Sequence, residues 1–396
     1  MIKNSVILIP NISHQNQVCD YLEQTANVLA KKNNNKVYII YHTESLSIKE
    51  ILKKIISKQV INFSKNINNI YYLHPIYLIP GKRIKLIKNI NSIIYSITIQ
   101  LILNLKYLNA ENHLIWMFFP QLVQFIEVRL PFWKVITDIV DFHTSPNSQK
   151  QKKLTKQKQL LLKKSNIISV NSHSLKNQFK ILTNKPIAVV PQGFNYKNFQ
   201  NIKQKSNIKL KTYKHLIGFI GQISQRLDFD LLKNLIRQNQ QWNFVFIGLK
   251  HHEPNISINK NHNFLKNFEE LTKYKNCMWF DSQPKDEIGS IIQQLDVCTI
   301  PYDISYDFNR YCYPMKLFEY FYMKKPVVST PIEELKQTKF KNLIKIGDTA
   351  NEWEKHIKLL LKKPWPKEYQ KKQQQLAIDN SWKNKVNSIG YIIEKH

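Results

Sequence analysis

The stretch DVCTIPYDISYDFNRYCYPMKLFEYFYMKKPVVST (Asp296–Thr330) contains a complete strand–helix–strand unit. An apolar run ends in a polar loop, Pro314 leads into a helical pattern that closes at Lys324 and Lys325, and Pro326 opens a second apolar run. Short apolar runs bounded by turn residues are typical of buried strands, and a crossover between parallel strands is right-handed. The stretch therefore predicts an α/β fold with a parallel sheet.

The same alternation of apolar runs and helical patterns extends over the whole chain, in two series. The first series of predicted strands comprises Val6–Pro10, Lys36–Tyr41, His113–Phe119, Lys134–Val140, Asn166–Ser172 and Ile187–Val190. The second comprises His215–Gly221, Asn243–Gly248, Asn276–Phe280, Asp296–Tyr302, Lys325–Thr330 and Leu343–Ile346. Between them, Lys197–Lys214 is polar and charged without an apolar period, which predicts a linker.

Two Rossmann-like, doubly wound parallel-sheet domains follow from these series. We expect an N-terminal domain over residues 1–200, a second domain over 201–378, and a final helix over 379–396. Ligands of such sheets bind beyond the carboxyl ends of the strands. With two sheets, the cleft between the domains is the expected site.

Composition excludes several classes of protein. Of 396 residues, 43% are hydrophobic and 12% aromatic, which argues against disorder, and Gly is only 8. The formal net charge is +31, and residues 1–200 hold 27 Lys/Arg against 8 Asp/Glu. Such a surface attracts anionic lipid, nucleic acid or phosphorylated substrates. A solvated basic surface that reflects an AT-rich genome is the alternative.

Targeting and redox signals favour a cytoplasmic protein. Its four cysteines form no CxxC pair, so the sequence predicts neither a zinc site nor a disulfide framework. The apolar run after Met1 is too short for a signal peptide. Asn89–Leu105 is too polar to span a membrane but has the period of an amphipathic helix, which either packs on a sheet or lies on the anionic inner face of a membrane.

Two constellations in the second half carry candidate chemistry. Gly221 ends an apolar run, and Arg226 follows it at a distance where its guanidinium could grip a diphosphate. Lys316 lies near the first turn of the predicted helix after Pro314, and Glu319 lies three residues further on. Helix N-termini favour phosphate, and a carboxylate one turn later can accept both hydroxyls of a ribose.

The run PMKLFEYFYMKKPVVST (Pro314–Thr330) resembles the signature of the GT-B glycosyltransferases, in particular the large retaining group that includes mannosyltransferases and many cell-envelope enzymes. Its usual form is P-x-K-x-x-E-[YA]-x-x-x-[GK]-x-P-V-[VI]. Val189–Phe199 is similar to the turn that closes the first domain of that family, and Asn380–Lys395 resembles its final helix, which crosses back to the first domain. The resemblance therefore implies that residues 1–200 are the acceptor-side domain and that 201–378 are the nucleotide-sugar-binding domain. Gly221–Leu232 resembles its opening loop, with Leu227-Asp228 in place of the usual Lys-Gly.

This resemblance implies roles for individual residues. Glu319 corresponds to the second Glu of the family's E-x7-E motif, which holds the ribose, and Tyr311 stands where the first Glu contacts the donor sugar. Nucleotide contacts are expected around the same two loops, from Lys316, Arg226, Gly221, Pro314, Met315 and Leu317. The loop Val140–Asn147 resembles the one whose His contacts the transferred sugar, which makes His143 the expected catalytic residue and Asp141 the residue that orients it.

The resulting expectation is a hexosyl-type glycosyltransferase (EC 2.4) for cell-envelope polysaccharide or glycolipid synthesis. It would move a sugar from a UDP- or GDP-sugar to an acceptor hydroxyl with retention, without a metal or other cofactor. The departing diphosphate would be stabilised by basic side chains and helix amides. The alternatives are an inactive relative that binds a sugar nucleotide or glycan, a sugar-nucleotide epimerase of the same fold, and a nucleic-acid binder; no nucleic-acid-binding motif is present, and nucleic acid is not the expected partner.

Overall fold

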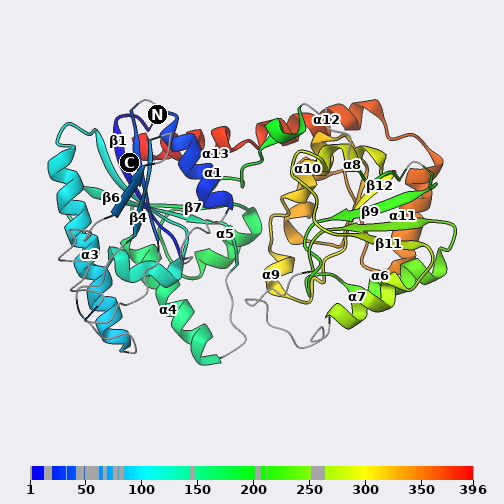
Figure 1. Cartoon of the computed structure of the whole chain (residues 1–396), viewed down its shortest axis with the longest axis horizontal. Helices are drawn as coiled ribbons and strands as arrows, with labels where there is room; N and C mark the ends of the chain where they lie inside the picture. The colour runs from blue at the N-terminus through cyan, green and yellow to red at the C-terminus, as the bar shows by residue number, and fades with distance from the viewer. Residues whose placement is uncertain are drawn as a thin grey trace. The chain divides into compact units, whose positions relative to one another are not determined.

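The chain forms two compact units by its internal contacts (Figure 1). The computed structural model describes residues 2–12, 20–32, 34–41, 49, 62–65, 69–74, 79, 84–142, 148–200, 207–210, 212–250 and 264–395. The first unit comprises Met1–Val140, Gln149–Pro191 and Trp382–His396, and the second comprises Asp141–Ser148 and Gln192–Ser381. Each unit is built on one sheet and has its own hydrophobic core.

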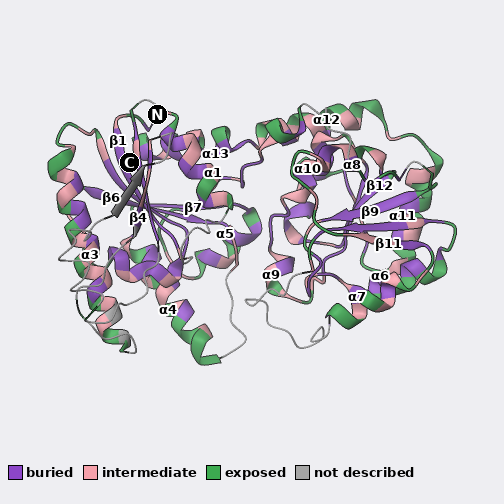
Figure 2. Ribbon diagram, viewed as in Figure 1, coloured by how far each residue is buried: buried purple, intermediate pink, exposed green. Residues whose placement is uncertain are grey.

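In the first unit the described strands form a sheet in the order β3-β4-β2-β1-β5-β6-β7-β8. Only the pairing of β3 with β4 is antiparallel among these neighbours. Every residue of the central strand β1 is buried (Figure 2), as expected for a parallel sheet covered on both faces. The strands are β1 (Ser5–Pro10), β2 (Lys36–Ile40), β3 (Asn62–Lys65), β4 (Ile70–His74), β5 (Asn112–Met117), β6 (Trp133–Ile139), β7 (Ile167–Val170) and β8 (Ala188–Val189).

The helices of the first unit cover its sheet. They are α1 (Asp20–Ala30), α3 (Lys85–Lys106), the 3-10 helix η1 (Pro120–Ile126), α4 (Ser148–Lys164), α5 (His173–Lys180) and α13 (Trp382–Lys395). The C-terminal helix α13 packs beside α1 and places Val386, Ile389 and Ile393 in the core of this unit. The last residues of the chain therefore complete the domain with which the chain begins.

In the second unit the described strands are all parallel, in the order β11-β10-β9-β12-β13-β14. The order reverses between β9 and β12, and ligands of doubly wound sheets bind at such a switch point. The strands are β9 (Leu216–Ile220), β10 (Asn243–Ile247), β11 (Cys277–Phe280), β12 (Val297–Ile300), β13 (Val327–Ser329) and β14 (Lys345–Ile346).

Helices line both faces of this second sheet. They are α6 (Phe229–Gln238), α7 (Phe264–Thr272), α8 (Ile288–Gln294), α9 (Asp307–Arg310), α10 (Lys316–Tyr322), α11 (Ala350–Lys362), α12 (Lys367–Asp379) and the 3-10 helices η2 (Tyr196–Phe199), η3 (Glu333–Lys336) and η4 (Thr338–Phe340). The helix α6 has its N-cap at Asp228, whose carboxylate accepts a hydrogen bond from the Leu231 amide at 2.9 Å. Asp228 therefore starts α6.

The predicted α/β class with two parallel sheets is confirmed, and each of the twelve predicted strands is present. β3 and β4 are not among the predicted strands: β3 is the short polar segment NFSK, whereas β4, IYYLH, is an apolar run that the two predicted series leave out. The predicted linker is wrong over the described part of Lys197–Lys214. Phe199, Ile208 and Leu210 are buried in the core of the second unit, because isolated apolar residues anchor this otherwise polar segment.

Candidate functional site

Two glycines lie at the carboxyl edge of the second sheet, directly after β9 and β10. Gly221 and Gly248 have φ angles of 149° and 150°, a region that side chains with a Cβ rarely adopt. A Cβ on Gly248 would lie 1.9 Å from the carbonyl oxygen of Gly221. The two strand-end loops therefore approach each other so closely that only glycine fits between them.

The ammonium group of Lys316 lies over this glycine loop. A Cβ on Gly221 would come within 2.6 Å of Lys316 Nζ, so the lysine covers the glycine directly. Lys316 Nζ donates a hydrogen bond to the Tyr302 hydroxyl at 2.6 Å and lies 4.4 Å from the centre of the Phe219 ring. An aromatic cradle of this kind attracts a cation while leaving it partly solvated. Lys316 is half-buried, and its charge is held at one position beside the loop.

A second cation shares the Tyr302 ring. The Arg226 guanidinium carbon lies 4.3 Å from the centre of the Tyr302 ring and 4.8 Å from that of Phe308. Its Nε donates to Asn309 Oδ1 at 2.9 Å, and the fully buried Asn309 returns a hydrogen bond from Nδ2 to the Arg226 carbonyl oxygen at 3.0 Å. The structure thus brings Gly221, Arg226 and Lys316 together, as the sequence leads us to expect.

Tyr302 is the residue that sequence reasoning missed. It follows β12 at the switch point, is only 5% exposed, and contacts both cations of the site. The sequence feature that could have identified Tyr302 is its position as an aromatic residue directly after a buried strand, at the carboxyl edge of the sheet. Its ring and hydroxyl keep two positive charges close to each other, an arrangement that suits an anion with more than one negative charge.

The helix α10 is fixed to this edge by Tyr320. The buried hydroxyl of Tyr320 accepts a hydrogen bond from the Ile220 amide at 3.0 Å, one residue before Gly221. Burial, followed by the neighbouring Cys298 and Glu319 side chains, holds the pKa of Tyr320 well above its usual value. Glu319 itself is half-buried in the first turn of α10. The predicted ribose-binding residue therefore lies on the helix that carries Lys316.

The remaining predicted residues of the α10 motif serve the start of the helix. Pro314 is buried, and Met315 is the N-cap residue. Leu317 is fully buried in the core, and its amide donates to the Pro314 carbonyl oxygen at 3.1 Å. The Leu317 side chain lies in the core of the second unit, so its expected role in nucleotide binding stays a prediction.

Asp141 and Phe142 begin the loop of the predicted catalytic residues, and both belong to the second unit. His143 lies outside the described residues. Asp141 is half-buried, and the Phe142 ring packs edge-on against the Tyr311 ring at 5.5 Å. Tyr311, where the resemblance expects a carboxylate, thus contacts the residue next to His143.

The Cys312 thiol lies close enough to Arg226, Lys316 and Asp141 for their charges to influence its pKa. Burial raises its pKa to about 11; Arg226 and Lys316 lower it, and Asp141 raises it. These influences show that Asp141 lies within electrostatic range of the site. At neutral pH the thiol is protonated, so Cys312 is a packing residue and not a nucleophile. Among the described residues no group of three or more His, Cys, Asp or Glu side chains could hold a metal ion.

Comparison with known proteins is consistent with this geometry. Residues 198–379 match the family model described as glycosyl transferases group 1. The matched segment runs from within η2 to the end of α12 in the second unit, and it includes the whole Tyr302 constellation.

One curated relative of this chain comes from Bacillus subtilis, and its name assigns it to teichuronic acid biosynthesis as the glycosyltransferase TuaH. The two sequences are 27% identical over 236 residues, which is 56% of this chain and 56% of the relative. The chain therefore spans little more than half the length of the curated relative that it matches.

Solved structures share the fold of this chain over almost its whole length. Sucrose-phosphate synthase from Thermosynechococcus elongatus has a TM-score of 0.67 at 12% identity, covering 99% of this chain and 98% of that one. HepE from Anabaena, in complex with UDP and glucose, has a TM-score of 0.63 at 10% identity, covering 98% and 99%. At these identities the likeness establishes the fold alone, and that fold is GT-B.

Proposed function

We propose that the protein transfers a hexosyl residue from a UDP- or GDP-sugar to the hydroxyl of a glycan or glycolipid acceptor in cell-envelope synthesis. The observation that carries the proposal is the pair of cations, Lys316 and Arg226, held on the Tyr302 ring at the switch point of the group 1 domain. Negative charge accumulates on the diphosphate as the sugar leaves, and fixed cations nearby stabilise that charge. The neighbour HepE is complexed with UDP and glucose, which supports a diphosphate donor.

The roles of individual residues follow from this proposal. Lys316 and Arg226 bind the diphosphate, Gly221 lets the backbone approach it, and Glu319 accepts hydrogen bonds from the ribose hydroxyls. His143 contacts the transferred sugar, with Asp141 as its orienting residue. Transfer proceeds with retention of configuration at the sugar. Cationic side chains, not a bound metal, stabilise the diphosphate leaving group.

A thermal-shift panel of UDP-, GDP-, ADP- and CMP-sugars tests the donor proposal, because a ligand that binds only the native state raises its stability. We expect one nucleotide class to raise the melting temperature and to support release of the nucleoside diphosphate when acceptor extracts are added. Activity should persist in EDTA. No shift with any nucleotide would contradict the proposal, and binding without turnover would favour the inactive relative that Tyr311 suggests.

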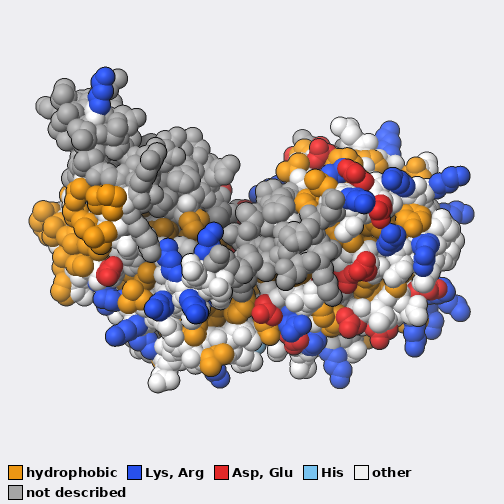
Figure 3. Space-filling view, turned by 90° about the horizontal axis from the view of Figure 1, so that it is seen from below, with side chains coloured by type: hydrophobic (Ala, Val, Ile, Leu, Met, Phe, Trp, Pro, Cys, Tyr) orange, Lys and Arg blue, Asp and Glu red, His pale blue; other side chains and the backbone are white. Residues whose placement is uncertain are grey.

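The first unit supports a membrane-bound acceptor. No helix in the described part of the chain is long and apolar enough to cross a membrane. However, α3 carries a stripe of exposed apolar side chains at steps of three, four and seven residues that continues past its end: Leu86, Ile90, Ile94, Leu101, Leu105 and Leu108. Figure 3 shows hydrophobic side chains gathered where α3 lies. The opposite face of α3 is buried, with Ile99 and Leu103 in the core.

A half-buried amphipathic helix on a basic unit is suited to the surface of an anionic membrane. We expect the protein to cosediment with vesicles that contain phosphatidylglycerol and to bind weakly to phosphatidylcholine alone. Leu101→Ser/Leu105→Ser should reduce binding, whereas Ile181→Ser, at another exposed apolar residue of the same unit, should not. Vesicle binding that does not change with lipid charge, with salt concentration or in the α3 variant would contradict the membrane proposal.

A further inference from the structure

A pocket of about 890 Å³ lies at the amino edge of the second sheet, the edge opposite Gly221 and Tyr302. Its walls come from the residues before β9, β12 and β13 and from the ends of α8, α10 and α11. The volume lies within the range of ligand sites in proteins. No part of the Lys316–Arg226 constellation lines it, so the pocket is separate from the proposed donor site.

Positive charge is concentrated in this pocket. Five lysines line it, Lys214, Lys324, Lys325, Lys362 and Lys363, against one acidic residue, Asp296. Lysines are favoured at helix C-termini even without a ligand, because each C-terminus carries about half an elementary negative charge. Three helix ends and Asp296 together offset only about half of the five ammonium charges. Lys325 is used structurally, with Nζ donating to the carbonyl oxygens of Gln293 and Leu295 at 2.8 and 2.7 Å.

The backbone around the pocket is held in an unusual conformation. Among the described residues, six non-glycine residues have positive φ angles, and four of these are asparagines, which tolerate that region. The other two, His215 at 55° and Lys324 at 59°, both line this pocket. Backbone strain of this kind tends to persist where a side chain is required at its position. Glycine would fit at residue 324 without strain, yet a lysine occupies it.

The other lining groups suit a carbohydrate. Tyr213 and Trp365 provide aromatic surface, and Tyr213 is 45% exposed. Gln293, Gln370 and His215 provide side chains that donate and accept hydrogen bonds, as sugar hydroxyls require. We propose that this pocket binds an anionic glycan, with its sugar rings against Tyr213 and Trp365 and its carboxylate or phosphate groups at the lysines. This proposal does not depend on the donor site.

Calorimetric titration of the full chain with tetragalacturonate, at low and moderate ionic strength, tests the proposal. Maltotetraose is the neutral probe, and inorganic phosphate, UDP and oligo-dT are competitors. We expect saturable binding of tetragalacturonate, weaker binding of maltotetraose, and little displacement by UDP. Displacement of tetragalacturonate by UDP would show that it binds at the donor edge of the sheet. Equal affinity for maltotetraose would show that the lysine charges do not contribute to binding, and preferential binding of oligo-dT would assign the pocket to nucleic acid. Each of these results would overturn the proposal.

Two matched double variants distinguish the effect of the pocket lysines from the effect of the protein's overall positive charge. Lys362→Ala/Lys363→Ala should weaken tetragalacturonate binding about tenfold. Lys355→Ala/Lys371→Ala removes the same charge from exposed positions outside the pocket and should leave binding unchanged. Lys324→Gly should preserve or raise the melting temperature, because it relieves the positive φ, while it weakens binding. Equal losses in both double variants, or a more stable Lys324→Gly protein with unaltered affinity, would overturn the proposal.

Discussion

Lys385 and Asp138 form a buried ion pair across 247 residues of sequence, with Nζ 2.9 Å from Oδ1. Their side chains are 1% and 0% exposed. The Ser169 hydroxyl donates to the same carboxylate oxygen at 3.0 Å. The pair fastens the C-terminal helix α13 to β6 in the sheet of the first unit.

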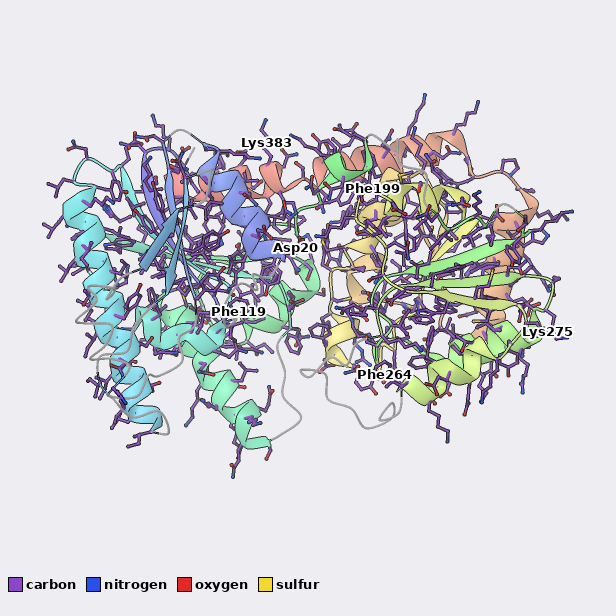
Figure 4. All side chains as sticks on the ribbon, in the orientation of Figure 1. Asp20, Phe119, Phe199, Phe264, Lys275 and Lys383 are labelled. Atoms are coloured by element: carbon purple, nitrogen blue, oxygen red, sulfur yellow. The ribbon has the colours of Figure 1, made fainter. Side chains whose placement is uncertain are left out.

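Lys385→Met should destabilise the first unit by about 3–5 kcal/mol, because it leaves the Asp138 carboxylate buried without its cation. Adding Asp138→Asn should recover part of this loss, since an amide carries no charge. Lys383→Met is the matched control: Lys383 lies on the same helix, exposed and labelled in Figure 4. Thermal unfolding with hydrogen exchange in β6 and α13 measures the effect. Equal stability of the Lys385→Met and Lys383→Met proteins would mean that the pair contributes little.

Lys316→Met should weaken binding of the donor's nucleoside diphosphate by about 1.5–3 kcal/mol, the range for hydrogen bonds to charged groups. Methionine keeps the apolar stem against Phe219 but removes the ammonium group. Uridine or guanosine without phosphates is the internal control, and its affinity should change little. If nucleoside and nucleoside diphosphate lose affinity equally, the lysine maintains the local fold and does not contact phosphate.

Glu319→Gln should weaken nucleotide binding by about 1.5–3 kcal/mol while the melting temperature stays almost constant. The amide keeps the shape of the side chain but loses the charge and one acceptor oxygen for the ribose hydroxyls. Calorimetry with the ribo- and 2′-deoxy forms of the nucleotide checks the role, since the variant should discriminate less between them. A change in melting temperature alone, of about 0.3–1 kcal/mol in stability, would instead assign Glu319 to the helix dipole.

His143→Ala should reduce kcat far more than it reduces nucleotide affinity, because the proposed contact of His143 is with the transferred sugar. Steady-state kinetics together with calorimetry of the nucleoside diphosphate separate the two effects. Asp141→Asn should show a smaller loss of the same kind if it orients the imidazole. An unchanged kcat for His143→Ala would exclude His143 from the reaction.

Lys158 provides a pH-dependent test of stability. It is 4% exposed on α4, its ammonium lies 5.5 Å from the Phe179 ring, and burial lowers its pKa to about 8. Between about pH 8 and the unfolded value of 10.5, the unfolded chain binds more protons at this site than the folded chain. The contribution of Lys158 to stability therefore rises with pH over that window.

Lys158→Met should accordingly raise the free energy of unfolding at pH 7 by about 1–3 kcal/mol, since a buried ammonium is replaced by an apolar chain of similar shape. The advantage should shrink as the pH rises from 8 towards 10. Urea unfolding of both proteins at pH 7 and 9.5 gives the difference. Lys156→Met, at an exposed position of the same helix, should change stability little at either pH. If the difference in the free energy of unfolding between the two proteins does not change with pH, the buried ammonium group is not its cause.

The fold and part of the site could be predicted because they depend on local patterns. Buried parallel strands appear as apolar runs, so every parallel strand except β4 was predicted. Gly221, Arg226, Lys316 and Glu319 lie beside strand ends or in a helix start, where chemistry is expected in such folds. Tyr302 and Tyr320 were not predicted, since an aromatic residue near a buried strand is usually core, and only its contacts distinguish a residue that carries two cations.

The sequence by itself determined the two parallel sheets and the glycines at strand ends, because each depends on residues close together in the chain. Only the tertiary structure decided that Lys385 pairs with Asp138, that Phe199, Ile208 and Leu210 join a core, and that Arg226 and Lys316 share the ring of Tyr302. The physical reason is that these relationships join segments tens to hundreds of residues apart, and no local pattern records which charged or aromatic side chains will meet when the sheet closes.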